Sequence, residues 1–168
     1  MADVLWSVAA MTMVPTAQTI RDGKYETTAG GVKFRVGESG SISFVSPITR
    51  SLRAGRYVLN VHIVRTDKQE PIEGNELLGT TAEIRRRSRG NVTTVIALPG
   101  DNFDGVEGGV ATGTPHNYVA RGGQKNLPDG IDVDTGFYWL QLKLQQEGPA
   151  SEAKRNAVSG ISLVYYGA

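Results

Sequence analysis

The sequence contains no cysteine, only two histidines and almost no net charge. Without cysteine, the chain has no disulfide bond, no thiolate metal site and no cysteine nucleophile. Its 18 basic and 17 acidic side chains give a formal net charge of +1, so no overall field attracts it to nucleic acid or to a membrane. We therefore expect neither of these as a partner.

Signatures of catalysis are missing as well. The serines form no G-x-S-x-G elbow, which removes the usual anchor of a hydrolase triad. No P-loop or dinucleotide-binding glycine pattern occurs between a strand and a helix. We therefore predict a protein that is not an enzyme and uses no cofactor.

The sequence also has no hydrophobic run long enough to cross a membrane. Its apolar N-terminal segment is short and mixed, and Asp3 stands where a secretory signal peptide carries positive charge. We expect synthesis in the cytoplasm without a signal peptide. Within residues 1–20, we interpret Val4–Val14 as an extended N-terminal arm or an edge strand that ends at Pro15.

Glycine, in contrast, is abundant. It supplies 21 of 168 residues, well above the usual share of about 7%. No internal repeat or linker is visible, so the glycines indicate the many turns of an all-β protein. The length predicts one domain over residues 1–168.

Two long segments, Leu52–Arg65 and Gly136–Gln146, alternate in polarity with the period of a strand. Each should bury one row of side chains in a shared core. The expected inward rows are Tyr57, Leu59, Val61 and Ile63 in the first segment, and Tyr138, Leu140, Leu142 and Leu144 in the second.

Shorter strands complete the pattern. They are expected at Lys24–Thr28, Val32–Val36, Ser41–Val45, Thr80–Arg87, Val92–Leu98 and Ile161–Tyr166. The spacing of the second and third predicts a hairpin, after which Pro47 should break the pairing. Residues 99–135 lack clear periodicity and are interpreted as one long Gly-rich loop, and no amphipathic helix is evident. The fold class is therefore all-β: an antiparallel, two-sheet, jelly-roll-like β-sandwich.

The strongest candidate contact residues are Phe137 and Trp139. Both lie on the outward row of Gly136–Gln146, where large rings need a cover. That cover is the N-terminal arm, the chain's own long loop, another protein chain or a sugar ring.

A basic run, Arg85-Arg86-Arg87-Ser88-Arg89, is the sharpest charge feature. Strand alternation places Arg85 and Arg87 on one face. With Arg89, they would contact a phosphate, a polysaccharide carboxylate or an acidic neighbouring subunit, or would form a solvated strand end that discourages aggregation.

Histidine and aspartate give weaker signals. His62 is interpreted as a hydrogen-bonded residue on a half-buried strand face. His116 and Tyr118 lie in the long loop, either as ligand contacts or as plain exposed side chains. Two Asp-Gly clusters make Asp101, Asp104, Asp132 and Asp134 weak calcium candidates, but neither cluster matches the EF-hand spacing, and such loops are ordinary turn chemistry. We therefore predict no metal.

One stretch carries a family resemblance. The letters L-R-A-G-R-Y-V-L-N-V-H-I (Leu52–Ile63) resemble the x-A-G-x-Y-x-L-x-V strand of β-jelly-roll carbohydrate-binding modules, and the closing G-I-S-L-V-Y-Y is similar to their last strand. A similar cadence occurs in jelly-roll decoration, spike and fibre proteins of tailed phages. The resemblance implies a sandwich fold and two classes of binding function.

Of these two classes, we expect a virion structural protein, specifically a capsid decoration (cement) protein of a tailed bacteriophage. It would act through contacts with the capsid protein or with copies of itself, as a homo-oligomer such as a trimer, and would be located in the virion. The alternative is a carbohydrate-binding module or spike domain that binds cell-surface glycan. In both cases the candidate residues are Phe137, Trp139, Arg85, Arg87, Arg89, His116 and Tyr118.

Overall fold

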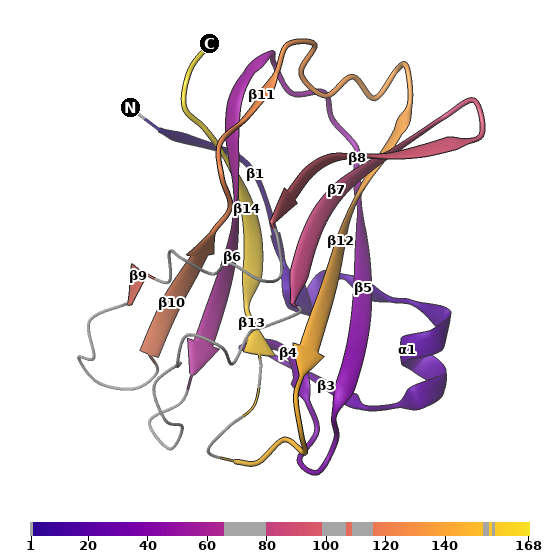
Figure 1. The fold of residues 1–168 in the computed structure, drawn as a ribbon, viewed down its shortest axis with the longest axis vertical. Coiled ribbons are helices and arrows are strands. Elements are labelled where there is room, and N and C mark those ends of the chain that lie inside the picture. Colours follow the sequence, from indigo (N-terminus) through magenta and orange to yellow (C-terminus); the bar gives the residue numbers. More distant parts are fainter. Residues whose placement is uncertain (1, 66–79, 99–106, 109–115, 153–154, 156) are drawn as a thin grey trace.

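Strand β6 (Gly55–Arg65) is the longest strand of the computed structural model and lies inside the first of two main sheets (Figure 1). The structure describes residues 2–65, 80–98, 107–108, 116–152, 155 and 157–168. The first sheet has the antiparallel order β1 (Asp3–Ala9), β14 (Gly160–Tyr165), β6, β10 (His116–Arg121) and β9 (Glu107–Gly108), and β11 (Lys125–Leu127) pairs with the start of β6.

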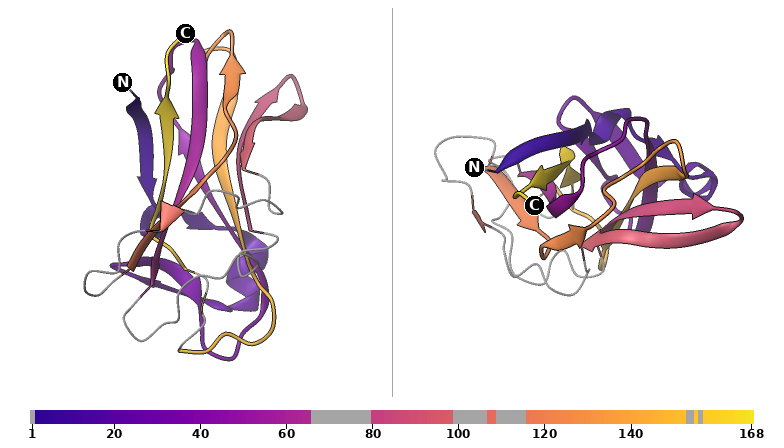
Figure 2. Two further views of the ribbon diagram at one scale, coloured as in Figure 1. Left: turned by 60° about the vertical axis from the view of Figure 1, so that its left-hand side comes forward. Right: turned by 90° about the horizontal axis from the view of Figure 1, so that it is seen from above.

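The second main sheet packs against the first, and the two form the layers of a β-sandwich (Figure 2). Its order is β2 (Val14–Pro15), β5 (Gly40–Ile48), β12 (Phe137–Gln146), β7 (Thr81–Ser88) and β8 (Asn91–Leu98). A small third sheet contains β13 (Ala157–Val158), β4 (Gly31–Phe34) and β3 (Tyr25–Thr28). The predicted all-β antiparallel sandwich is confirmed.

The core lies between the inner faces of the two main sheets. The inward rows predicted for β6 and β12 are confirmed, because each of the eight side chains is at most 8% exposed. Alternation along both strands therefore identified the correct faces. The outer face of β6 is also covered: Val58 and Asn60 are buried there, outside the main apolar cluster.

Residues 99–135 do not form the single long loop that was predicted. Their described part contains β9, β10 and β11, and β10 pairs with β6 over six residues. Strand β10 was not predicted because its alternating segment is only a few residues long before Gly122 and Gly123 interrupt it.

The predicted hairpin between Val32–Val36 and Ser41–Val45 is wrong. Strand β4 pairs with β3 and β13, whereas β5 pairs with β12 and β2. Pro47 does not break β5 either, since it lies opposite Trp139 within the nine-residue register with β12. Strand β2 pairs only with Phe44 and Val45, so at Pro47 a strand neighbours β5 on one side only, where a missing N–H is tolerated.

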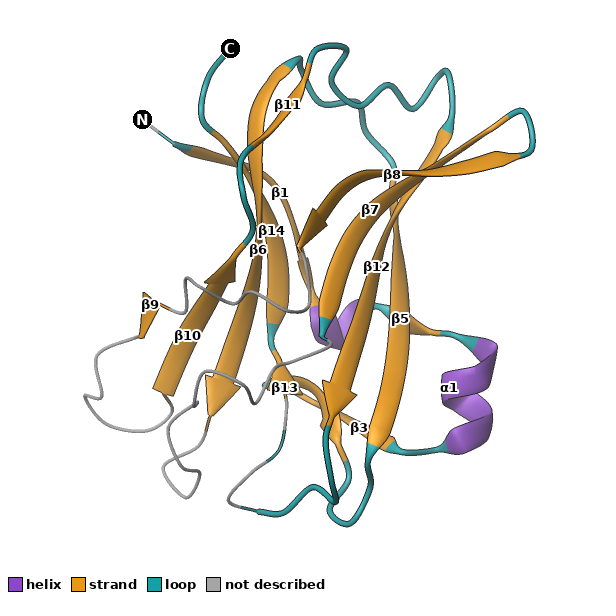
Figure 3. Cartoon of the chain, viewed as in Figure 1, coloured by secondary structure: helices purple, strands orange, loops and turns teal. Residues whose placement is uncertain are grey.

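The N-terminal segment forms structure along its whole described length rather than an extended arm. Strand β1 is an edge strand, which was one of the two interpretations of this segment. It is followed by a 3₁₀ turn at Ala10–Thr12. A helix that was not expected, α1 (Ala17–Asp22), lies beside β5 (Figure 3). Thr16 caps its first turn and Gly23, at φ 63°, ends it, so the helix is too short to show a helical period. Among the described residues, no helix is long and apolar enough to cross a membrane.

Candidate functional site

The outer face of the second sheet brings the predicted aromatic and basic residues together. Phe137 lies opposite Arg87, and Trp139 lies opposite Arg85, in the register of β12 with β7. Phe137 is 79% exposed, which is the highest exposure among the large hydrophobic residues of the described chain, and Trp139 is half-buried. We call this surface, with Gln141 added, the aromatic face. No part of the described chain covers Phe137.

Arg85 connects the Trp139 ring to a small hydrogen-bond network. The Arg85 guanidinium lies 6.0 Å from the ring centroid and donates a hydrogen bond of 3.2 Å to Gln141 Oε1. Arg85 Nε also lies 3.7 Å from a carboxylate oxygen of Glu83, which accepts a 3.1 Å hydrogen bond from the Thr94 hydroxyl. Polar donors and acceptors therefore stand beside an aromatic plane.

Strand β7 and strand β8 are joined by a two-residue turn beside the aromatic face. Arg89 and Gly90 have φ values of 48° and 86°, the positive pair that a type I′ hairpin requires. A groove of about 340 Å³ separates this turn from residues 133–136, and Arg87, Arg89, Asp134 and Phe137 line it. The structure thus places the predicted residues Arg89 and Phe137 in the lining of one groove.

Arg86, between these residues in sequence, belongs to the other face. Its guanidinium lies 5.6 Å from the Tyr138 ring centroid and donates 3.3 Å hydrogen bonds to the carbonyl and hydroxyl oxygens of Thr135. It therefore fixes the wall of the groove from the inner side. Sequence reasoning missed Gln141 and the 133–136 wall, although the outward row of β12 already contained Gln141.

His116 and Tyr118 do not join the aromatic face. Both belong to β10 in the first sheet, whereas Phe137 and Trp139 belong to β12 in the second. Their role as interface or glycan contacts stays a prediction, separate from the aromatic face. Sequence spacing alone does not show which strands belong to the same sheet.

The calcium candidates divide into two pairs. Asp101 and Asp104 lie outside the described residues. Asp132 Oδ1 accepts a 3.0 Å hydrogen bond from the backbone N–H of Asp134, which is ordinary Asx-turn chemistry. In the described part of the chain, no three histidine, aspartate or glutamate side chains are grouped as metal ligands.

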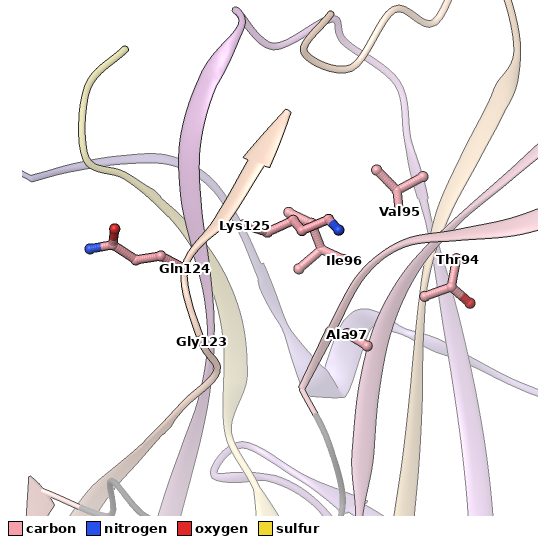
Figure 4. A pocket seen from close by; sticks show the side chains of 7 residues that line it. All are labelled: Thr94, Val95, Ile96, Ala97, Gly123, Gln124 and Lys125. Carbon is pink, nitrogen blue, oxygen red and sulfur yellow. The ribbon is translucent and has the colours of Figure 1, made fainter. Parts of the chain in front are cut away.

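A second hollow, of about 450 Å³, lies at the open side of the sandwich, between β8 and the segment that precedes β11. Figure 4 shows the Lys125 side chain reaching toward Ile96, while Gln124 points away from the gap. Ile96 is 2% exposed, so this side chain belongs to the core. No sequence motif indicated this hollow, and no aromatic side chain lines it.

The outer face of the first sheet holds a polar pair. His62 Nε2 lies 2.8 Å from Ser162 Oγ, which confirms His62 as a hydrogen-bonded residue on a half-buried face. Burial lowers the pKa of His62 below its ordinary value, because the charged imidazolium loses solvation there. The side chain is therefore neutral at pH 7.

This shift predicts a loss of stability in mild acid. Below about pH 6.5 the unfolded chain takes up a proton that folded His62 resists, so the free energy of unfolding should fall as the pH drops toward the lowered pKa. Urea unfolding at pH 7.5 and pH 5.5 measures the effect. His62→Gln should flatten the dependence, whereas His116→Gln, which removes the other histidine, should keep it. An equal slope in wild type and His62→Gln would contradict the assignment.

Comparisons with known proteins leave the chain without a family. No protein-family model matches it, and no curated protein matches it. Among solved structures, it is similar to the carbohydrate-binding module TmCBM61 in complex with β-1,4-galactotriose, at 14% identity and a TM-score of 0.35, over 80% of this chain and 70% of that one.

Two further solved structures show similarity at the same level. The module BiXyn10A CBM1 has 12% identity and a TM-score of 0.40, over 98% of this chain and 99% of that one. The infectious bursal disease virus VP2 subviral particle has 14% identity and a TM-score of 0.36, over 99% and 33%. Similarities this low assign no function, and they give no support to the specific expectation of a decoration protein.

Proposed function

We propose that the chain is a glycan-binding module whose aromatic face stacks against sugar rings. The observation that carries the proposal is the exposure of Phe137, at 79%, beside Trp139 on one strand. Successive outward residues of a strand are about 7 Å apart, so the two rings form a short apolar platform. In this proposal the module binds and does not catalyse.

The chemistry of the aromatic face fits a carbohydrate better than a purely apolar partner. A pyranose ring presents C–H groups on its faces and hydroxyl groups at its rim. The rings of Phe137 and Trp139 match the first, since aromatic faces carry partial negative charge. Gln141, Arg85 and Glu83 lie on the same face and provide hydrogen-bond donors and acceptors for hydroxyl groups.

The test is a binding measurement with a panel of neutral and acidic oligosaccharides. Phe137→Ala and Trp139→Ala should each weaken binding of a captured sugar by about tenfold or more, because truncation of an aromatic anchor commonly costs more than about 1 kcal/mol. Phe137→Ala should leave the free energy of unfolding nearly unchanged, since the ring is mostly in solvent.

The matched control is Val4→Ala. Val4 is 61% exposed on the edge strand of the first sheet, so this substitution removes exposed apolar surface away from the aromatic face. This variant should bind like wild type. If no sugar in the panel binds, or if Phe137→Ala and Trp139→Ala bind as well as Val4→Ala does, the glycan proposal is wrong.

A second candidate function is docking onto another protein subunit, as in the decoration protein expected from the sequence. It is favoured by Val92, which is 36% exposed on β8, so exposed apolar side chains of β8 and β12 lie on either side of Arg87. Light scattering separates the two: an oligomer such as a trimer that dissociates in Trp139→Ser, with no sugar binding, supports docking. A monomer that binds sugar supports the glycan module.

A further inference from the structure

The groove beside the aromatic face contains two cations that the stacking proposal leaves without a role. Arg87 and Arg89 flank it, and the exposed ring of Phe137 forms part of its lining. A neutral sugar needs only hydrogen bonds at its rim, which Gln141 and Glu83 already offer. The two guanidinium groups point to an additional chemical feature of the ligand.

The four arginines of the basic run differ in what they already bind. Arg85 is held by Gln141 and Glu83, and Arg86 is held by Thr135. Arg87 and Arg89 are both exposed, and neither side chain makes a hydrogen bond or an ion pair with another residue of the described chain. Their donors are therefore available for a ligand.

The backbone at Arg89 adds an independent argument. Among the described residues, Arg89 is the only residue other than glycine with a positive φ, at 48°. A left-handed backbone is unfavourable for a residue with a long side chain, and asparagine or glycine is preferred at the first position of a type I′ turn. An unfavourable residue at an exposed turn is a reason to seek a function for its side chain.

We propose that this groove binds an anionic substituent, a carboxylate or a sulfate, on the sugar that stacks on Phe137. The ligand of the module is then an acidic polysaccharide. This inference rests on the proposed glycan binding and specifies its substrate class. A planar guanidinium matches the two oxygens of a carboxylate or sulfate and is the side chain best suited to hold them in a partly open site.

Asp134 also lines the groove, and its charge opposes an anionic ligand. The local balance is nevertheless two free cations against one carboxylate. Asp134→Asn should therefore strengthen the binding of an acidic sugar and leave that of a neutral sugar unchanged. A change in affinity for the acidic sugar alone would indicate that the groove acts through its charge.

The experiment compares three probes: an oligogalacturonate, a sulfated galactan oligosaccharide and a neutral galacto-oligosaccharide of equal length. Wild type should bind at least one acidic probe about tenfold more tightly than the neutral one, and 0.5 M salt should remove most of that preference. The double variant Arg87→Gln with Arg89→Asn should lose the preference and keep the weaker neutral binding. The two acidic probes distinguish carboxylate from sulfate recognition.

The variants are chosen so that folding is not at risk. Arg89→Asn creates the Asn-Gly pair that a type I′ turn favours, so the melting temperature should stay or rise while acidic-sugar binding falls. Lys143→Gln is the matched control, because Lys143 lies on the same outward row but about 20 Å from Phe137 at 3.3 Å per residue. It should leave the preference intact.

Each outcome decides between the two proposals. If neutral and acidic probes bind equally, or if the arginine double variant keeps the preference, the groove does not bind an anion and the glycan module stands alone. If wild type binds none of the three probes and no other sugar of the panel, both proposals are wrong. A preference that Lys143→Gln abolishes as fully as the arginine variant would also overturn the groove assignment, because it would reflect net charge only.

Discussion

Leu142→Ala is expected to lower the free energy of unfolding by about 2–5 kcal/mol, which is a large part of the stability of a domain this size. Leu142 is completely buried in the middle of β12, between Phe44 of β5 and Ala82 of β7. Truncation removes apolar contacts and leaves a cavity. Ala82 is already small, so the neighbouring strand offers little side chain to fill the space.

Urea unfolding of Leu142→Ala and of Lys143→Ala measures the difference between the two faces of one strand. Lys143 is exposed and adjacent in sequence, so its truncation should change the free energy of unfolding by less than about 0.5 kcal/mol. A loss below about 1 kcal/mol for Leu142→Ala would mean that the core relaxes into the cavity far more than such cores usually do.

The success of sequence reasoning at β6 and β12 has a simple physical origin. A strand with one buried face must alternate, and eight inward side chains could be read directly from two segments. The same alternation placed Arg85 and Arg87 on one face and Phe137 and Trp139 on one face. The turn at Ser88–Asn91 was also predictable, because its geometry is local.

Pairing between distant segments was not predictable in the same way. Strand β5 pairs with β12, nearly a hundred residues away, because a nine-residue register buries more surface than the short hairpin suggested by spacing. The pairing of β10 with β6 also joins segments far apart in the sequence, so it could not be predicted from spacing. The groove was therefore only partly predictable. Its turn is a local feature, but its 133–136 wall is positioned by long-range contacts.

Gly130 is the residue that best tests how this wall is held. It precedes Ile131, which exchanges hydrogen bonds of 2.8 and 2.9 Å with Leu52 across the end of the sandwich. Two residues further on, the backbone N–H of Val133 donates a 3.1 Å hydrogen bond to Ser51 Oγ. These contacts anchor the segment that continues into the groove.

A side chain at Gly130 has no space. A Cβ atom there would overlap the Leu52 carbonyl oxygen and lie 2.7 Å from the Arg53 carbonyl carbon, which are backbone atoms that cannot rotate away. Gly148 provides a matched control, because its φ of 69° is close to the 64° of Gly130 but its Cβ would meet nothing within 4 Å. The two glycines share a backbone conformation and differ in free space.

Gly148→Ala should therefore cost about 1–2 kcal/mol, the usual penalty of a left-handed backbone, and should leave ligand binding unchanged. Gly130→Ala should cost at least about 2 kcal/mol more, because the backbones at Leu52 and Gly130 must separate and the bridge with Ile131 must weaken. Because that bridge positions residues 133–136, Gly130→Ala should also reduce the preference for acidic sugars under conditions in which the variant remains folded. Equal destabilisation of the two variants would show that the close approach at Leu52 relaxes freely, and that this approach is not what positions the wall of the groove.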